Sequence, residues 1–302
     1  MTVFDRETLL REIASFFADR DGETRTEIVR RVEQEVDKAG GAALARLGRR
    51  LSTSGEAWDY YPPDLLARHI HLSLADILLD PLSALIGVEH VLGVGTAPTV
   101  ILANHLSYAD ANIVEVLLRW VGATAVADRL TVLAGPKVYS SLKRLFSSLC
   151  FGTIKTPQSS TVSSEDAVMN PREVARVARR CIDIAHERLR EGDVLLVFIE
   201  GTRSRTLGMQ SALPGASRYL EVPGTQVIPA AITGSEAMFP IDDPRLHTVR
   251  VGVRLGAPMD AGALLARADG DRRIVVDTIG AAIADLLPPH YRGVYDRSPS
   301  VA

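Results

Sequence analysis

The spacing of apolar residues predicts helices in the first part of the chain. Apolar side chains recur at helical intervals on one side of the first segment, with charged residues opposite, at Leu9, Leu10, Ile13, Phe16 and Phe17. A second charged, helix-like stretch covers 24–51 and is interrupted by two consecutive glycines. Asp64 has the residue type of a helix N-cap and precedes another apolar-periodic stretch that ends near Leu78. These patterns predict a helical N-terminal region over residues 1–85.

From about residue 86 the pattern changes to alternating strands and helices. Short apolar runs typical of buried strands recur at 100–103, 130–134, 194–199, 226–232 and 249–255. Helices are predicted over 110–120, 138–149 and 171–190, and a Ser/Thr-rich loop over 156–165. Strands that alternate with helices favour a mixed, mostly parallel sheet flanked by helices. The sequence therefore predicts an α/β domain over 86–302 that follows the helical N-terminal domain.

Composition and charge narrow the functional classes. Hydrophobic residues make up 46% of the 302 residues and charged residues 24%, which is typical of a globular protein with its own core. The net charge of −3 and the isoelectric point near 6.2 argue against a protein that binds nucleic acid through bulk charge. The two cysteines are too few for a disulfide framework and have no metal-ligand spacing. We therefore expect a reducing compartment and no metal site.

The sequence also bears on membranes. No apolar run approaches the roughly 18 residues that a membrane-spanning helix needs, and the first residues lack the basic-then-apolar order of a signal peptide. We expect a cytoplasmic protein, either free or peripherally associated with the inner face of the cell membrane. Phe16 and Phe17 have two interpretations, membrane docking or packing against their own domain. The arginines of 171–190 likewise indicate either an anion site or a solvated helix face.

Two segments place reactive side chains directly after predicted strands. The first is NHLSYAD over 104–110, and the second is FIEGTRSR over 198–205. Ligands bind at the carboxyl ends of strands in α/β proteins, so this placement favours a site. A histidine is the natural general base near neutral pH, and a carboxylate on its far nitrogen fixes its tautomer and orientation. His105 and Asp110 supply these two residue types.

A turn is required between the members of this pair. Five positions along a regular helix correspond to about 140° of rotation, which separates the side chains. Because His105 lies where a strand should pass into a helix, we predict that it reaches Asp110. His71 and Asp76 have the same spacing within a continuous helical pattern. We predict that these two point apart, with His71 at the helix surface or between the domains.

The second segment has the composition of an anion-binding loop. Gly201 lets the backbone approach a ligand closely, Thr202 offers a hydroxyl, and Arg203 has the geometry to bind an anion bidentately. Arg205 adds a second cation two positions on. Either segment alone is a weak signal, because a lone string of this kind is most often a charged loop. Their joint appearance, each after a strand, is much stronger.

Together the two segments resemble the glycerolipid acyltransferase family, whose bacterial lysophosphatidate acyltransferases carry N-H-x₄-D and F-P-E-G-T-R-S-R motifs. Softer motifs of the family have counterparts at 134–137 with 151–154, and at 227–232. The resemblance covers about residues 88–260. It implies that His105 is the general base and Asp110 its orienting partner. It also implies that the substrate is bound by residues of the second segment and by one lysine, namely Glu200, Gly201, Thr202, Arg203, Arg205 and Lys137.

The resemblance implies direct acyl transfer without a cofactor. A lysophospholipid hydroxyl, deprotonated by His105, would attack the thioester of acyl-CoA or acyl carrier protein at a membrane surface. The alternative acceptors are glycerol-3-phosphate, a glycolipid or an amino-lipid. The intact pair of His105 and Asp110 argues against a non-catalytic lipid-binding protein, and a thioester hydrolase is the remaining alternative. Backbone amides near the His105 turn are candidates to stabilise the oxyanion.

The sequence departs from the family pattern in places that bear on the acceptor. Ile199 replaces the usual proline of the second segment. The family commonly has an arginine shortly after the strand at 151–154, whereas this chain has Lys155 there. Lys155 and Lys137 are candidates for the missing positive charge, although a lysine does not reproduce a bidentate arginine site.

Overall fold

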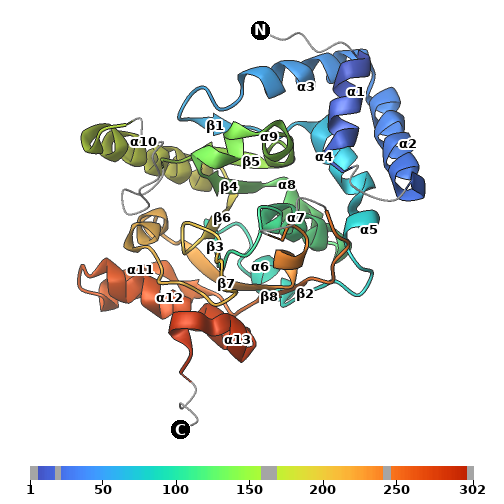
Figure 1. Ribbon diagram of the computed structural model, residues 1–302. Helices are drawn as coiled ribbons and strands as arrows, with labels where there is room; N and C mark the ends of the chain where they lie inside the picture. Colours follow the sequence, from blue (N-terminus) through green and yellow to red (C-terminus); the bar gives the residue numbers. More distant parts are fainter. Residues whose placement is uncertain (1–5, 18–21, 158–168, 241–245, 298–302) are drawn as a thin grey trace.

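A nine-stranded sheet forms the centre of the molecule in the computed structural model, which describes residues 6–17, 22–157, 169–240 and 246–297. The strand order is β1-β5-β4-β6-β3-β7-β8-β2, with β9 paired to β7. The bounds are β1 Tyr60–Tyr61, β2 Ala84–Ile86, β3 Thr99–Ala103, β4 Leu130–Ala134, β5 Gly152–Lys155, β6 Val194–Phe198, β7 Gln226–Thr233, β8 Gly252–Leu255 and β9 Met259–Asp260. Figure 1 shows helices on both sides of this sheet.

The sheet is mixed and mostly parallel, which confirms the predicted fold class. The five central strands β5, β4, β6, β3 and β7 run parallel to one another. The β1 strand is antiparallel to β5, and β8 and β9 are antiparallel to β7, whereas β2 is parallel to β8. Every residue of β3 is buried, as expected for a central strand that is covered on both faces.

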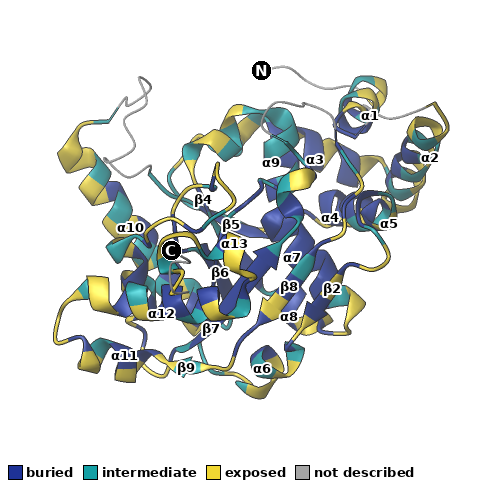
Figure 2. Cartoon of the chain, turned by 60° about the horizontal axis from the view of Figure 1, so that its bottom comes forward, coloured by how far each residue is buried: buried dark blue, intermediate teal, exposed yellow. Residues whose placement is uncertain are grey.

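Helices cover the two faces with separate apolar cores. The bounds are α1 Arg6–Ser15, α2 Gly22–Ala39, α3 Gly41–Thr53, α4 Leu65–Ser73, α5 Ala75–Leu78, α6 Val88–Gly93, α7 Asp110–Trp120, α8 Thr124–Asp128, α9 Leu142–Ser148, α10 Pro171–Arg190, α11 Ala261–Arg267, α12 Arg272–Leu286 and α13 Pro289–Arg292, with 3₁₀ turns η1 Pro136–Ser140, η2 Pro214–Leu220, η3 Ser235–Ala237 and η4 Gly293–Tyr295. Ile101 and Ala103 of β3 pack with α7 and the N-terminal helices. Val100 and Leu102 pack on the other face with α10 and α12. Figure 2 shows the buried positions gathered at the sheet and on the inner sides of the helices.

The N-terminal helices pack on the α/β part of the chain. Phe16 and Phe17 are buried, and both rings lie against Phe146 of α9, at centroid distances of 5.7 and 6.2 Å. Of the two interpretations of these phenylalanines, packing is the one observed. The same region also supplies β1 to one margin of the sheet and β2 to the other. The boundary near residue 85 stays a prediction.

Most predicted elements appear at their expected positions. Asp64 caps α4, since its side chain accepts hydrogen bonds from the backbone N–H groups of Leu66 and Ala67. The predicted helix over 138–149 is instead divided into η1 and α9 by Ser141, which is extended. The strands that the periodicity missed, β1, β2, β5 and β9, have two to four residues each. From residue 158 on, the predicted Ser/Thr-rich loop lies outside the described residues.

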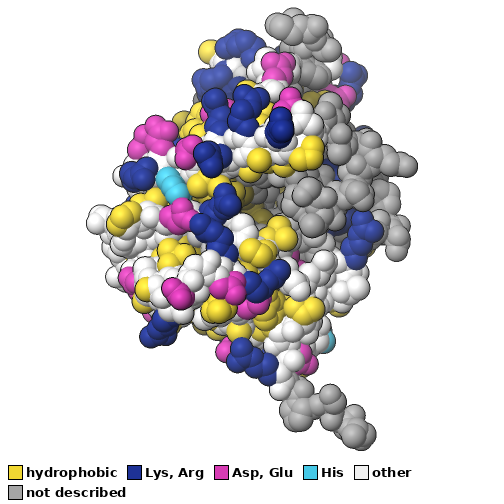
Figure 3. All heavy atoms as spheres, turned by 90° about the vertical axis from the view of Figure 1, so that its left-hand side faces the viewer, with side chains coloured by type: hydrophobic (Ala, Val, Ile, Leu, Met, Phe, Trp, Pro, Cys, Tyr) yellow, Lys and Arg dark blue, Asp and Glu magenta, His cyan; other side chains and the backbone are white. Residues whose placement is uncertain are grey.

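The charged side of α10 is a solvated helix face. Figure 3 looks at the side of the molecule that carries α10 and shows basic and acidic side chains interspersed there. Arg180 pairs with Asp59, and Arg188 pairs with Asp193 and Glu191. These arginines are therefore engaged with carboxylates rather than gathered into an anion site. Within the described part of the chain, no helix has the length and apolarity to cross a membrane.

Candidate active site

The two motif segments meet at one edge of the sheet because their strands are neighbours in register. Ala103, the last residue of β3, is paired with Phe198, the last residue of β6. The backbone N–H of Ile199 donates to the carbonyl of Ala103 at 2.9 Å and continues this pairing. Beyond it, the side chain of Asn104 bonds both the N–H and the C=O of Ile232 in β7. His105 and Glu200 thus emerge side by side.

His105 and Asp110 form the hydrogen-bonded pair that the predicted turn requires. The distance from His105 Nδ1 to Asp110 Oδ2 is 2.8 Å. Asp110 is the first residue of α7 and is fully buried. Its Oδ2 also accepts from the backbone N–H groups of Leu106 and Ser107, and its Oδ1 accepts from Ser235 Oγ at 2.5 Å. With Nδ1–H donating to this carboxylate, Nε2 of His105 is the nitrogen that can accept a proton.

The imidazole ring of His105 is held on its flat side as well. It stacks on the ring of Phe198, with centroids 4.1 Å apart and planes 16° from parallel. The side chain keeps 15% of its surface exposed, so a ligand can reach it. Two side chains, one polar and one aromatic, therefore fix both the direction and the plane of the ring. Such fixation favours a general base, because proton transfer requires a defined geometry.

Glu200 ties the two motif segments together. Its carboxylate is buried, and its oxygens accept from the backbone N–H groups of His105 at 2.9 Å and Gln210 at 2.8 Å. Burial raises the pKa of Glu200, and these two hydrogen bonds oppose the shift. The backbone N–H of Ser204 in turn donates to the His105 carbonyl at 2.8 Å. The structure thus places Glu200 beneath the His105 loop, with its oxygens already bonded.

Gly201 serves the turn of this loop. Its φ is 67°, and a Cβ atom there would lie 2.2 Å from Leu213 Cδ1. The sequence interpretation had been a close approach of backbone to ligand, whereas the space beside Gly201 is filled by Leu213. A glycine is needed here because both the left-handed conformation and the contact exclude a side chain.

Of the predicted anion-binding residues, Arg203 lies over Tyr108, and sequence reasoning missed two residues of the candidate site, Arg144 and Ser235. Thr202 and Arg205 are exposed, and the Arg203 guanidinium lies over the Tyr108 ring at 4.8 Å. Arg144 of α9 lies over the same ring at 5.0 Å. Tyr108 is inside the first motif, but nothing in the sequence connects Arg144 to it. Ser235, the other missed residue, holds Asp110 from a position 125 residues away.

The two lysines proposed for the missing positive charge differ in accessibility. Lys137 is exposed in η1, directly after β4, at the same edge of the sheet as His105. The Lys155 ammonium lies over the rings of Trp58 at 4.2 Å and Tyr139 at 5.5 Å and donates to the carbonyl of Gly55. Burial lowers the pKa of Lys155. Lys155 is therefore engaged with the β1 region, and Lys137 is the accessible lysine.

The amides next to His105 do not form the expected oxyanion site. The N–H groups of Leu106 and Ser107 already donate to Asp110 Oδ2. The expectation that amides of this turn stabilise the oxyanion is therefore wrong for these two groups. Their hydrogen bonds instead keep the Asp110 carboxylate in place.

His71 and Asp76 do not pair, as the comparison with His105 predicts, and His71 occupies the second of its two predicted places. Asp76 pairs with Arg31 of α2 and not with His71, as the helical spacing predicts. However, His71 is buried rather than on the helix surface, in a small cavity that α4 and α5 share with Asn112 and Val116 of α7. Its Nδ1 has no hydrogen-bond partner among the described residues, and burial lowers the pKa of His71 to about 4. His71 thus lies between the N-terminal helices and the α/β part.

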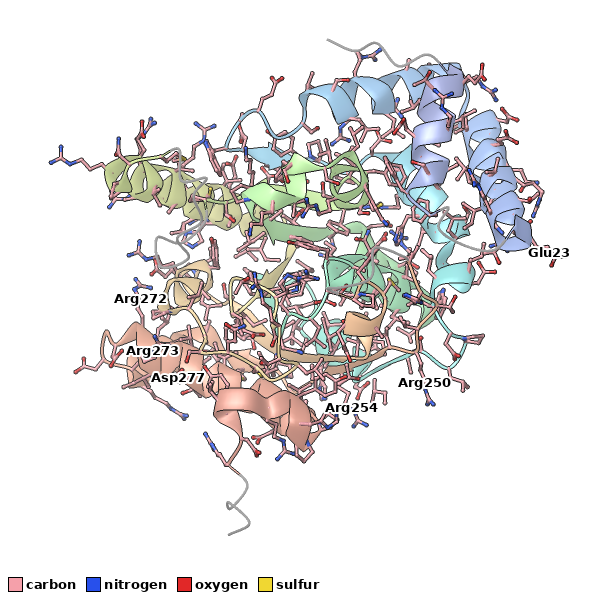
Figure 4. All side chains as sticks on the ribbon, viewed as in Figure 1. Glu23, Arg250, Arg254, Arg272, Arg273 and Asp277 are labelled. Carbon is pink, nitrogen blue, oxygen red and sulfur yellow. The ribbon has the colours of Figure 1, made fainter. Side chains whose placement is uncertain are left out.

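A second cavity lies away from this site. It has a volume of about 220 Å³ and is lined by Glu221, Leu265, Arg272 and their neighbours. Figure 4 shows Arg272 and Arg273 near α11 and α12, at the periphery of the molecule. Glu221 precedes β7, so this cavity is at the opposite edge of the sheet from His105. Among the described residues, no group of side chains has the composition to hold a metal ion.

Comparisons with known proteins give a similar solved structure and a matching family model. A solved structure with a similar trace is the 1-acyl-sn-glycerophosphate (LPA) acyltransferase PlsC from Thermotoga maritima, at 16% identity over 82% of this chain and 83% of that chain, with a TM-score of 0.46. A search of curated proteins finds no match. Residues 87–233 match the model of a family described as Acyltransferase. This segment contains both motif loops, and the match supports the acyltransferase family for this part of the chain and acyl transfer as its chemistry.

Proposed function

We propose that this protein moves a fatty acyl group from an acyl thioester to the hydroxyl of a lysophospholipid such as 1-acylglycerol-3-phosphate. The observation that carries the proposal is the imidazole of His105, oriented by the buried carboxylate of Asp110 at 2.8 Å. The family match supports the same reaction class. The donor is acyl-CoA or acyl carrier protein, and direct transfer to the acceptor has no step that requires a cofactor.

The geometry supports a mechanism in which His105 moves one proton twice. Nε2 takes the proton of the acceptor hydroxyl while the hydroxyl oxygen attacks the thioester carbon. Asp110 stabilises the imidazolium that forms, because its carboxylate accepts the Nδ1–H bond. As the tetrahedral intermediate collapses, the C–S bond breaks and the leaving thiolate takes the proton from Nε2. One ester and one thiol result, and the enzyme returns to its starting state.

Arg203 and Arg144 are the groups that we propose for the anionic head of the acceptor. Both guanidinium groups lie over Tyr108, three residues after His105. Neither has a carboxylate at ion-pair distance within the described ranges, which leaves their charge for a ligand. Arginine binds phosphate oxygens bidentately, so the pair can hold a phosphate monoester. Thr202, Arg205 and Lys137 lie at the same edge and complete the proposed substrate-binding set.

An acceptor of this class resides in membranes. We propose that the protein works in the cytoplasm and meets its acceptor at the inner face of the cell membrane. The chain would then take its acceptor from the lipid surface while the acyl thioester arrives from solution.

The proposal is tested by thiol release from a long-chain acyl-CoA with lysophosphatidate, glycerol-3-phosphate or no acceptor. We expect acceptor-dependent release by the wild-type chain and a decrease of about 10²- to 10⁴-fold in kcat for His105→Ala. His69→Ala is the matched control, because His69 is exposed on α4 and lies in neither motif segment.

The outcomes separate the alternatives. Release only with glycerol-3-phosphate would make that molecule the acceptor, and equal release without acceptor would indicate a thioester hydrolase. Full activity of His105→Ala would overturn the mechanism. An inactive wild-type chain with acyl-CoA is tested next with acyl carrier protein, and inactivity with both donors would refute acyl transfer to these acceptors.

A further inference from the structure

Leu207, in the loop after β6, has a backbone conformation that leucine rarely adopts. Its φ is 67°, in the left-handed region where a Cβ atom is crowded. In the described part of the chain, only Asp269 shares a positive φ among residues other than glycine. The Leu207 side chain is nevertheless 38% exposed. Strained residues of this kind cluster at functional sites, and here the strained residue presents an apolar side chain to the surface.

A second exposed aliphatic residue lies beside Leu207. The backbones of Gly208 and Gly293 are in contact, since a Cβ atom on Gly208 would lie 2.9 Å from Gly293 Cα. The loops are also joined by hydrogen bonds, in which Met209 N–H donates to the Tyr291 carbonyl and Val294 N–H donates to the Met209 carbonyl. Val294 is 63% exposed. Leu207 directly precedes Gly208, and Val294 directly follows Gly293. We call the pair of Leu207 and Val294 the docking tip.

The docking tip lies at the same edge of the sheet as His105, and arginines flank it. Ser204, three residues before Leu207, bonds the His105 carbonyl through its backbone N–H. Arg205 and Arg297 are exposed, and Arg292 is half-buried at the end of α13. Arg292 lies 4.0 Å from Asp296, whereas Arg205 has no ion pair with any described residue. An apolar tip with cations around it matches the acyl and phosphate layers of an anionic bilayer.

We propose that Leu207 and Val294 insert into the surface of an anionic lipid bilayer and so bring the His105 edge to a membrane-borne acceptor. The inference deepens the proposed function, on which it rests in taking the acceptor to be a lipid. The side chains enter the interfacial region, and Arg205 and its neighbours contact lipid phosphates. The proposal also explains why leucine occupies this strained position. A glycine would relieve the backbone strain but would have no side chain to insert into the bilayer.

Co-sedimentation of the full chain with lipid vesicles tests the docking tip. The vesicles contain phosphatidylglycerol and phosphatidylethanolamine, with phosphatidylcholine vesicles as the neutral comparison. Leu207→Gly relieves the positive φ, so we expect Tm to rise by about 2 °C. We expect the same variant to bind anionic vesicles about tenfold more weakly. Val294→Ser weakens binding in the same direction.

The chain offers a matched control for each of two properties of Leu207, its positive φ and its exposed aliphatic side chain. Asp269→Gly relieves the other positive φ, and Ile274→Ser removes an aliphatic side chain that is 50% exposed. Both precede or begin α12, whose Arg272 pairs with Glu221 before β7, at the opposite edge of the sheet. We expect both controls to bind vesicles as the wild type does. Wild-type binding by Leu207→Gly, or an equal loss in Ile274→Ser, would overturn the docking tip.

Vesicle binding and acyl transfer are measured separately, so their failures are distinguishable. If Leu207→Gly loses vesicle binding and the wild-type chain transfers no acyl group, the docking tip stands and the proposed function is wrong. If the wild-type chain transfers acyl groups and vesicle binding does not depend on Leu207, the proposed function stands and the docking tip is wrong.

Discussion

Asp110 accepts hydrogen bonds from four donors, and only one of them is the His105 ring. Two are backbone amides of its own turn, and the fourth is the hydroxyl of Ser235 in η3. The amides fix Oδ2, which faces the histidine, whereas Ser235 is the donor that the described residues supply to Oδ1. The orientation of His105 therefore depends on a serine that takes no part in proton transfer in the proposed mechanism.

Ser235→Ala is expected to lower kcat by about tenfold with little change in KM. A hydrogen bond to a buried carboxylate is worth about 1.5–3 kcal/mol, and its loss leaves Oδ1 of Asp110 without this donor. Ser235→Thr, which keeps the hydroxyl, should recover part of the rate. Steady-state kinetics with acyl-CoA and the active acceptor measure both constants.

Ser217→Ala is the comparison that separates positioning from stability. Ser217 is also fully buried, and its hydroxyl donates to the Pro214 carbonyl in η2. We expect this variant to lower Tm without changing kcat. An equal decrease of kcat in the two variants would mean that Ser235 acts through stability alone.

The sequence predicted the hydrogen-bonded pair of His105 and Asp110 but not the residues that hold it. His105 and Asp110 are recognisable because a strand-to-helix turn makes their spacing meaningful. Ser235 and Arg144 reach the site through tertiary structure, and neither lies in a motif. Glu200 lies next to His105, as its place after a strand predicts, but its contacts with backbone amides follow from the register of β3 and β6, which the sequence does not reveal.

At the scale of elements, the loop after β6 is built around one left-handed glycine. Gly201 turns the chain so that Glu200 points under His105 while Arg203 reaches Tyr108. Ile199, which stands where the motif that it resembles has proline, is fully buried, and its N–H donates to the Ala103 carbonyl. A proline has no such donor, so this chain gains one hydrogen bond between the two motif segments.

Gly201→Ala is expected to destabilise the protein by about 1–3 kcal/mol and to decrease acyl transfer. The added Cβ meets Leu213 at 2.2 Å and adopts a φ of 67°, so the loop must shift. Urea unfolding and the thiol-release assay measure the two effects. Gly215→Ala is the matched control, because its Cβ would meet nothing within 4 Å and its φ is not positive. Equal stability of the two variants would contradict this account of the loop.

Long, strongly patterned elements were predictable, and short ones were not. The helix over 171–190 agrees with α10 residue for residue, because it combines Pro171, a capping box at Asn170 and a four-residue apolar period. The break between α4 and α5 at Leu74 is invisible to the same reasoning, since apolar spacing continues across it. Strands of two or three residues, such as β1, carry too few positions to show a period.

At the scale of the whole molecule, His71 couples the packing of the N-terminal helices to pH. Burial lowers its pKa to about 4 from the ordinary value of 6.5. Between these values the unfolded chain binds a proton that the folded chain does not. The stabilising contribution of neutral His71 should therefore be fully present above pH 6.5. As the pH drops toward 4, the free energy of unfolding should fall by up to about 3 kcal/mol.

Urea unfolding of the wild type and His71→Leu across pH 4 to 7 checks this contribution. We expect the difference in pH dependence to appear in that window, because leucine cannot take up the proton. His69→Leu, at an exposed position two residues earlier, should keep the wild-type dependence. Parallel curves for the wild type and His71→Leu would show that His71 is not buried in its neutral form.

The short strands β1 and β2 determine which truncated forms of this protein leave strand edges unpaired. Because β1 lies on β5 at one margin and β2 lies on β8 at the other, excision of residues 1–86 would uncover two strand edges at once. Bare edges invite pairing with other chains and aggregation. A fragment trimmed to residues 87–233, the segment that the family model matches, would also lose β8 and β9 and would bare the edges of β5 and β7. Such a fragment would be prone to self-association, although it contains both motif segments.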